Sequence, residues 1–290
     1  MKKTVAVVGT GIMGKGIADN FLKNKYKVYV WNRNPKRLTT LIKKGAIKVN
    51  SPREAAEMAD IVFEVTANDE SSKAVWLGKD GIIAGAKKDS ILITCATLSI
   101  EWTEQLAKLA KQVTRNFFDM PMTGGRTAAE SGKLFLLVGG DENKLKAISS
   151  DLKAIAGSIT YFGKAGSGMK FKLLLNTLQA IHGVALGEVL RVAKETGQDV
   201  KKVGDFLSER PGGTSGKGAW INYQNPPKET SFSLNWMTKD LRYTKKMVRS
   251  ASSGQAKFKT PLLDDTLAKL ETGIKKNMGE GDWTNINKLK

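Results

Sequence analysis

The chain has 290 residues, of which 41% are hydrophobic and 26% charged, and its formal net charge at pH 7 is +19. This length suits one large domain or two ordinary ones, and the composition is typical of globular cores. One cysteine and one histidine exclude an internal disulfide framework, an all-cysteine metal site and a multi-histidine metal site. We therefore expect no metal site. An acid–base enzyme built from this chain is expected to use a lysine or a carboxylate as its proton donor.

The positive charge permits two interpretations. A basic surface can bind nucleic acid, and it can also attract a phosphorylated cofactor and carboxylate substrates. Because the lysines are spread along the chain, we expect a diffuse solvated surface without a dedicated nucleic-acid site. The apolar run that follows Lys2 and Lys3 is too short for a secretory signal, and polar residues interrupt the apolar stretch 173–190. We therefore expect a cytoplasmic protein without a membrane span.

Up to about residue 163, short β-branched runs alternate with amphipathic stretches. This alternation predicts βαβ units and a doubly wound, parallel sheet. The expected strands are 4–8, 27–31, 61–66, 91–95, 114–119, 134–138 and 160–162, and the helical stretches between them include 12–24, 35–44, 52–59 and 100–111.

From Gly168 onward the strand patterns end, and long helical patterns replace them. Such a change of pattern marks a second domain. The expected fold class is therefore α/β, with an N-terminal Rossmann doubly wound sheet over residues 1–163 and an all-α C-terminal domain over residues 164–290. The segments 208–218 and 222–231, rich in Gly, Pro, Ser and Asn, are expected to connect helices.

A glycine-rich turn, Gly9-Thr10-Gly11-Ile12-Met13-Gly14, follows the first expected strand and opens an amphipathic helix. In such a G-x-G-x-x-G turn the first glycine allows the tight bend, the second lets backbone approach a pyrophosphate, and the third allows the helix to pack on the strand. The free N–H groups at the helix N-terminus favour phosphates. We predict a dinucleotide site here, with contacts from Gly9, Gly11, Ile12, Met13 and Gly14.

The end of the second expected strand indicates which dinucleotide binds. It reads Trp31-Asn32-Arg33-Asn34-Pro35-Lys36 and lacks the carboxylate that would bind the ribose 2′-hydroxyl of NAD. Arg33 can pair with a 2′-phosphate and stack on adenine, and Lys36 or Arg37 adds positive charge. NADP(H) is therefore expected, with Asn32, Arg33 and Lys36 among its ligands, and NAD(H) is the less favoured alternative.

Two further segments contain chemically informative residues. The first is Phe118-Asp119-Met120-Pro121-Met122-Thr123-Gly124-Gly125, and the second runs from Gly166 to Asn176. Together with the glycine turn, these motifs resemble those of the β-hydroxyacid dehydrogenase family, which includes 3-hydroxyisobutyrate dehydrogenases and glyoxylate/succinic semialdehyde reductases. The resemblance extends from residue 3 to about residue 285 in the same order and spacing.

The resemblance implies roles for particular residues. The family pattern G-x-G-x-x-x-K-x-x-N-N places the catalytic lysine at Lys172 and its second asparagine at Asn176, with Leu175 in place of the first. The other implied contacts are Thr123, Gly124 and Gly125 to the substrate carboxylate, Phe232 and Asp240 near the substrate, and Thr97 and Lys239 near the cofactor.

The chemistry of an aldehyde reduction requires a group such as Lys172. Hydride transfer builds negative charge on the oxygen, and an ammonium group stabilises that charge and donates the proton. Asn176 lies four residues further on and shares the helix face of Lys172, whereas Lys170 points elsewhere.

We therefore expect an NADP-dependent oxidoreductase that interconverts a short semialdehyde or oxo acid and its hydroxy acid. Glyoxylate, succinic semialdehyde, malonic semialdehyde and methylmalonate semialdehyde, the last of the 3-hydroxyisobutyrate type, are the expected carboxylate-bearing substrates. The resemblance also implies a homodimer or homotetramer.

Two alternatives remain open. An imine reductase shares the fold but typically carries Asp or Tyr in place of the lysine. A non-catalytic, nucleic-acid-associated family member loses the lysine. The lysine at position 172 argues against both.

Overall fold

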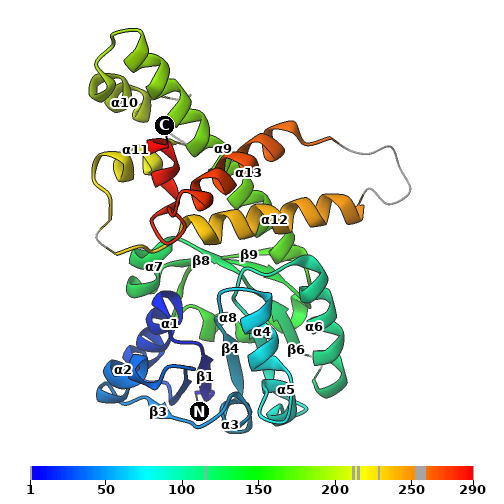
Figure 1. Cartoon of the computed structure of the whole chain (residues 1–290). Helices are drawn as coiled ribbons and strands as arrows, with labels where there is room; N and C mark the ends of the chain where they lie inside the picture. The colour runs from blue at the N-terminus through cyan, green and yellow to red at the C-terminus, as the bar shows by residue number, and fades with distance from the viewer. Residues whose placement is uncertain are drawn as a thin grey trace. The chain divides into compact units, whose positions relative to one another are not determined.

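The computed structural model describes residues 2–114, 116–210, 213, 216–227, 229–251 and 259–289. The chain divides into two compact units, Met1–Lys172 and Leu173–Lys290 (Figure 1). This division falls within a single long helix, α9 (Ser167–Glu195), whereas the change of sequence pattern suggested a boundary between residues 163 and 164.

The described residues of the first unit form a nine-stranded, mostly parallel sheet. Its order is β3-β2-β1-β4-β5-β6-β8-β7, and β9 pairs with β8. β1 to β6 pair in parallel, and β8 runs antiparallel to β6 and β7. The strands are β1 (Val5–Val8), β2 (Val28–Trp31), β3 (Ile47–Lys48), β4 (Ile61–Glu64), β5 (Ile91–Thr94), β6 (Asn116–Asp119), β7 (Met122–Thr123), β8 (Leu134–Gly139) and β9 (Ala156–Gly163).

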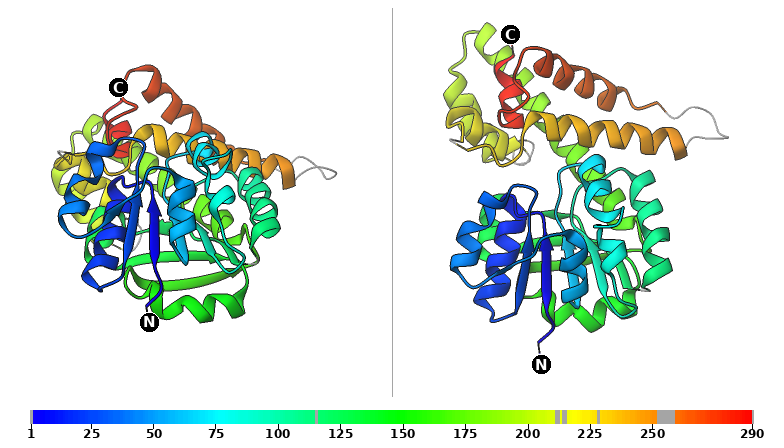
Figure 2. Two further views of the ribbon diagram at one scale, coloured as in Figure 1. Left: turned by 90° about the horizontal axis from the view of Figure 1, so that it is seen from below. Right: turned by 60° about the horizontal axis from the view of Figure 1, so that its bottom comes forward.

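Helices cover both faces of this sheet because its central strands are apolar on both sides. All four residues of β1, β4 and β5 are buried, as expected for parallel strands between two helical layers. The helices on the two faces of the sheet can be followed in Figure 2. One hydrophobic core contains Phe21 and Ile148, and the other contains Trp76 and Trp102. The helices are α1 (Ile12–Lys23), α2 (Thr39–Lys43), α3 (Pro52–Met58), α4 (Asp69–Trp76), α5 (Ile82–Gly85), α6 (Ile100–Val113), α7 (Gly125–Ser131) and α8 (Glu142–Leu152), with the 3₁₀ turn η1 (Pro35–Leu38) before α2.

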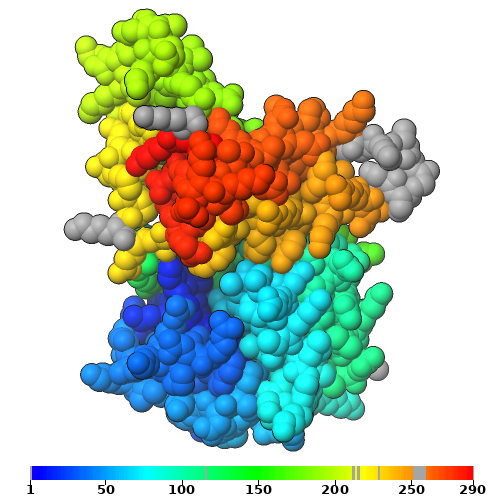
Figure 3. Space-filling model, in the orientation of Figure 1, coloured from blue at the N-terminus to red at the C-terminus, as the bar shows by residue number. Residues whose placement is uncertain are grey.

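The second unit is helical in its described part, and its core gathers Ala180, Leu234, Met237, Leu241 and Leu270. After the C-terminal part of α9 come α10 (Val200–Ser208), α11 (Lys217–Gln224), α12 (Leu234–Ala251), α13 (Pro261–Lys275) and the 3₁₀ helix η3 (Trp283–Lys288). The side chains of α12 and α13 form one continuous surface of this unit (orange in Figure 3). A Rossmann-like sheet followed by an all-helical domain confirms the predicted fold class.

The segments expected to connect helices in the second unit do so only in part. α11 occupies residues that the sequence analysis assigned to both of them, because the segments 208–218 and 222–231 overlap its two ends. Residues 211, 212, 214, 215 and 228 of these segments lie outside the described residues.

Helix α9 is long and apolar enough, by length and composition, to cross a bilayer. In its most apolar 18-residue window, 44% of the residues are buried within the molecule. Core helices of soluble proteins pass the same test, so the absence of a membrane span remains a prediction.

Gly187 of α9 lies against the side chain of Asn287, where an added Cβ would come within 2.4 Å of Oδ1.

A pair of helical glycines in the second unit tests the packing of α10 on α11. A Cβ on Gly204 would lie 2.3 Å from the ring of Trp220, whereas a Cβ on Gly218 would meet nothing within 4 Å. We expect Gly204→Ala to lower the free energy of unfolding by about 1–3 kcal/mol through overpacking. Gly218→Ala, the matched control, should be neutral or stabilise by up to about 1 kcal/mol. Urea unfolding measures both, and an equal effect of the two substitutions would contradict this packing.

Candidate active site

The predicted dinucleotide turn connects β1 to α1 at the carboxyl edge of the sheet. Gly9 has a φ of +97°, and an added Cβ there would lie 2.3 Å from the carbonyl oxygen of Val65. A Cβ on Gly14 would lie 1.9 Å from the carbonyl oxygen of Gly9. The turn therefore packs directly on the residue that follows β4, and neither glycine can be replaced without moving backbone.

The surroundings of this turn fit a dinucleotide. Gly11 caps α1 without a side-chain hydrogen bond, which leaves the first N–H groups of the helix available to a pyrophosphate. The hydroxyl of Thr10 is buried and has no hydrogen-bond partner among the described residues. The backbone N–H of Thr10 donates to the Asn32 side-chain oxygen at 3.0 Å, which ties the turn to the end of β2.

The structure adds Arg37 to the residues around the turn. The side chain of Asn34 accepts from the Lys36 N–H and starts η1. A guanidinium nitrogen of Arg37 then lies 4.0 Å from the position that a Cβ on Gly11 would take. Arg33 and Lys36 are exposed just beyond β2. From the sequence, Arg37 was predicted only to add positive charge, because the bend of η1 that brings it back to the turn was not predicted.

A buried carboxyl group, Glu64, directly precedes Val65, the residue on which the turn packs, and it was not predicted from the sequence. Glu64 ends β4, in register with Val8 of β1 and Thr94 of β5. The Thr94 hydroxyl donates to its Oε2 at 2.6 Å, and the Thr66 N–H donates to its Oε1 at 3.1 Å. These bonds shape the loop after β4, on which Gly9 packs. The sequence predicted a strand through 61–66, whereas the strand ends at Glu64.

Burial raises the pKa of Glu64 above its usual value, although the hydrogen bonds from Thr66 and Thr94 oppose this effect. The side chain is fully buried. Burial therefore shifts this carboxyl group toward its neutral form relative to a carboxyl group in water.

The predicted carboxylate anchor consists of Thr123, Gly124 and Gly125. Thr123 ends β7 and pairs with Phe135 of β8. Gly124 and Gly125 have φ values of +115° and +65° and open α7. Successive positive φ values favour glycine, and the absence of side chains at both positions lets an anion approach the backbone N–H groups closely.

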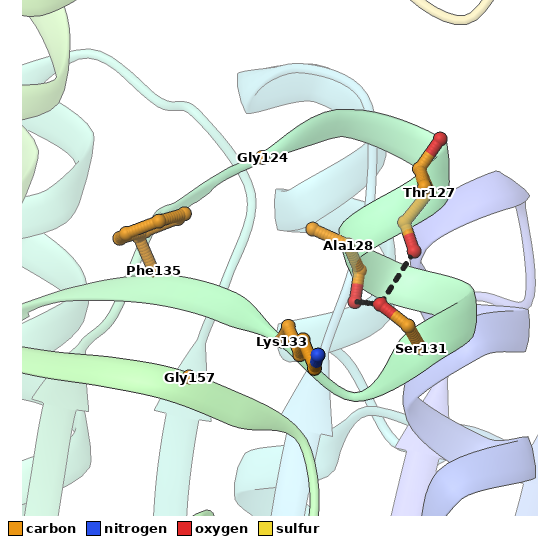
Figure 4. Close-up of a pocket in the computed structure, with 7 residues that line it drawn as sticks. All are labelled: Gly124, Thr127, Ala128, Ser131, Lys133, Phe135 and Gly157. Atoms are coloured by element: carbon orange, nitrogen blue, oxygen red, sulfur yellow. Dashed lines mark hydrogen bonds between the residues drawn. The ribbon is translucent and has the colours of Figure 1, made fainter.

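A pocket of about 410 Å³ borders this anchor on the side of α7 (Figure 4). It is lined by Gly124, Thr127, Ala128, Ser131, Lys133, Phe135 and Gly157. Of these residues only Gly124 belongs to the predicted anchor. The pocket is therefore a neighbour of the anchor and not the anchor itself.

The two candidate lysines of α9 have different surroundings. Lys172 is 7% exposed. Lys170 lies at the surface, where its ammonium pairs with a Glu104 oxygen at 3.2 Å and the two side chains are 45% and 50% exposed. Thr97, predicted to lie beside the cofactor, precedes Leu98, whose N–H donates to the Met169 sulfur at 3.2 Å in the first turn of α9.

The second unit brings together three of its four predicted site residues. The Asn176 side-chain amide donates to an Asp240 oxygen at 2.5 Å, and the other Asp240 oxygen lies 2.9 Å from the Lys239 ammonium. Asn176 and Asp240 are buried, at 1% and 0% exposure. Phe232 precedes α12, and its ring centroid lies 6.2 Å from that of Trp236.

Comparison with protein families matches nearly the whole chain. Residues 4–163 match the NAD binding domain of 6-phosphogluconate dehydrogenase, and residues 166–289 match the family described as NAD-binding of NADP-dependent 3-hydroxyisobutyrate dehydrogenase. The chain belongs to the β-hydroxyacid dehydrogenase family. This β-hydroxyacid dehydrogenase is accordingly an NAD(P)-dependent oxidoreductase, as the sequence motifs predicted.

Individual relatives agree with this assignment. An oxidoreductase of Synechocystis sp. is 31% identical over 252 residues, covering 86% of this chain and 85% of the relative. The mitochondrial 3-hydroxyisobutyrate dehydrogenase of Rattus norvegicus is 29% identical over 280 residues, covering 92% and 80%. Among solved structures, Psf3 in complex with NADP+ and 2-OPP matches with a TM-score of 0.88, 22% identity and 99% coverage of both chains. At this level of identity, the likeness to the Psf3 structure shows a shared fold.

The raised pKa of Glu64 predicts a specific pH dependence of stability. Above the ordinary value of 4.5 the unfolded chain releases this proton while the folded chain retains it. The Glu64 contribution to stability is therefore complete below pH 4.5 and is lost as the pH rises through the folded-state pKa. Glu64→Gln, which cannot ionise, should reduce the fall in the free energy of unfolding as the pH rises above 4.5.

Urea unfolding at several pH values measures this slope. Glu130→Gln, at an exposed position, is the control and should keep the wild-type slope. Equal slopes for Glu64→Gln and the wild type would show that Glu64 is already ionised in the folded protein.

Proposed function

We propose that this β-hydroxyacid dehydrogenase uses NADP(H) to interconvert a short semialdehyde or oxo acid and the corresponding hydroxy acid, with Lys172 as the general acid and base. The observation that carries this proposal is the position of Lys172. It is a buried lysine at the place of the family's catalytic lysine, close to the start of a helix whose first turn contacts the dinucleotide-binding unit.

The substrate carboxylate would bind at Thr123, Gly124 and Gly125. A hydroxyl and backbone N–H groups are hydrogen-bond donors, and donors bind a charged carboxylate more strongly than an uncharged group. The threonine keeps the hydroxyl of the serine that is usual in the family and adds a methyl group. Binding the substrate through this end would leave its carbonyl free for the reaction.

NADPH, when bound, supplies the hydride for reduction. As the carbonyl carbon accepts it, the electron pair of the C=O bond moves to oxygen, and the Lys172 ammonium stabilises that charge and transfers a proton to the oxygen. In the oxidation, neutral Lys172 accepts the hydroxyl proton. Asn176, one turn further along the same helix face, would orient the substrate hydroxyl.

The buried cluster of the second unit supports the role of Asn176. Because its amide donates to Asp240, the side-chain oxygen of Asn176 has a defined direction. Lys239 balances the charge of Asp240. By resemblance to the family, Phe232 and Asp240 would contact the substrate and Lys239 and Thr97 the cofactor.

NADP(H) is proposed over NAD(H) because the end of β2 carries basic residues and no carboxylate. Arg33 would bind the adenosine 2′-phosphate, and Arg37, beside Gly11, would contribute a second guanidinium. Asn32, held by the Thr10 N–H, would keep this segment in register with the turn. The family description that matches residues 166–289 is likewise that of an NADP-dependent enzyme.

Substitution of the two α9 lysines tests the catalytic assignment. Lys172→Ala should abolish turnover while leaving NADPH affinity nearly unchanged, because the acid–base group is lost and the dinucleotide turn is intact. Lys170→Ala is the matched control and should keep the wild-type rate within about twofold, since it loses only an exposed ion pair. Oxidation of NADPH, followed with glyoxylate and with succinic, malonic and methylmalonate semialdehydes, measures both variants. A Lys172→Ala rate above a few per cent of wild type would refute this role.

The same assay distinguishes the competing activity. A cyclic imine added to the substrate panel should not be reduced. Reduction of the imine together with inactivity toward all four carbonyl substrates would identify an imine reductase instead.

Removal of a guanidinium tests the cofactor assignment. Arg33→Ala and Arg37→Ala should each weaken NADPH binding by roughly 10- to 100-fold, the cost of a lost charge-assisted hydrogen bond, and should leave NADH binding unchanged. Lys27→Ala removes an equal charge at the amino end of β2 and is the control. Fluorescence titration measures these affinities. A tenfold wild-type preference for NADH would contradict the proposal.

A further inference from the structure

The carboxylate of Asp119 binds the start of the predicted catalytic helix, and the backbone of Asp119 leads into the predicted substrate anchor. Asp119 ends β6, and its own backbone continues through Met120 and Pro121 into Thr123. The side chain is 0% exposed. None of the roles proposed above uses this group.

The two oxygens of Asp119 bind the backbone at the start of α9. Oδ1 accepts from the Gly166 N–H at 2.6 Å, and Oδ2 accepts from the Met169 N–H at 2.8 Å. The N–H groups of a first helical turn have no partner within the helix, and the positive end of the helix dipole attracts a carboxylate. Burial raises the pKa of Asp119, while these backbone donors oppose that rise. The Asp119 side chain therefore fixes the position and the orientation of the first turn of α9 relative to the end of β6.

The same turn has little freedom to move elsewhere. A Cβ on Gly168 would lie 2.2 Å from the Leu137 carbonyl oxygen, so the helix start rests directly on β8. A Cβ on Gly139 would lie 2.3 Å from Oδ1 of Asp119, so no side chain fits between β8 and the carboxylate. Because β8 also pairs with Thr123 of the anchor, the anchor and the helix start share one rigid support.

We infer that Asp119 is a positioning residue for the reaction: its carboxylate sets the place of Lys172 relative to the carboxylate anchor. This inference rests on the proposed function. Lys172 lies three residues beyond Met169, less than one helical turn, so a shift of the first turn moves the lysine by the same amount. A displacement of about 1 Å between reacting groups costs on the order of 100-fold in rate.

Another carboxylate provides a matched control. Asp60 accepts the backbone N–H of Thr4 at 2.7 Å and the Thr4 hydroxyl at 2.8 Å, at the amino ends of β1 and β4. It is thus a carboxylate that holds backbone at the opposite edge of the same sheet. Loss of Asp60 should affect stability without affecting the geometry around Lys172.

The test uses the full chain with Asp119→Asn, Asp119→Ala, Asp60→Asn and Asp60→Ala. NADPH titration counts the binding-competent sites, so that kcat per site does not depend on any misfolded fraction. Asp119→Asn, which keeps one acceptor oxygen, should lower kcat per site by about tenfold, and Asp119→Ala by about 100-fold, with the dissociation constant of NADPH within twofold of wild type. The Asp60 variants should keep kcat per site within twofold. If Asp119→Ala does not fold, Asp119→Asn carries the comparison.

Hydrogen–deuterium exchange gives a second readout that needs no substrate. A peptide spanning residues 164–174 should exchange at least tenfold faster in the Asp119 variants than in the wild type or in the Asp60 variants. Unchanged exchange, or faster exchange with an unchanged kcat per site, overturns the inference. If Lys172→Ala remains active, the proposed function fails, whatever the Asp119 variants do. If Lys172→Ala is inactive but the Asp119 variants match the Asp60 variants, only the positioning role fails.

Discussion

The first unit depends on contacts made where its parallel strands end. Strands that run in one direction finish at one edge of a sheet, so the segments that follow β1, β4, β5 and β6 must share that edge. The carboxylate of Asp119 and the buried Glu64 each hold backbone there. Both are buried acids, and donors from neighbouring segments satisfy their oxygens, which is the condition for burying such groups at a tolerable cost.

The dinucleotide turn is packed closely against the loop that follows β4. Gly9 and Gly14 touch Val65 and each other so closely that no side chain fits. The position of the loop after β4 therefore decides the position of the turn. Glu64 controls that loop through Thr66, so a residue without any direct contact to a cofactor still contributes to the shape of its site. The buried hydroxyl of Thr10 has no hydrogen-bond partner among the described residues. It is therefore a group of this turn that a ligand could bind.

The sequence predicted the parts of the molecule that periodicity and motifs encode. The apolar runs of β1, β4 and β5, the glycine turn and the change to long helices were recognisable because each is a local pattern. β3 and β7 have two residues each, too few for any period, and β9 (Ala156–Gly163) is half-exposed, so only its last residues looked like a strand. The sequence could not assign roles to three residues, Arg37, Glu64 and Asp119, because their partners lie 26 to 50 residues away or are reached only through tertiary structure. Arg37 reaches Gly11 through a 3₁₀ turn, and Glu64 reaches Thr94 through strand register.

Gly139 and Asp119 are 20 residues apart in the chain but lie in close contact, so the two positions are expected to evolve together. A larger residue at 139 requires that the carboxylate shorten or withdraw, and a longer acid at 119 requires the space that glycine leaves. Neither residue can be replaced by a larger one alone while the start of α9 stays in the same position. In descendants and relatives of this enzyme that preserve the geometry, the two positions should therefore change as a pair or not at all.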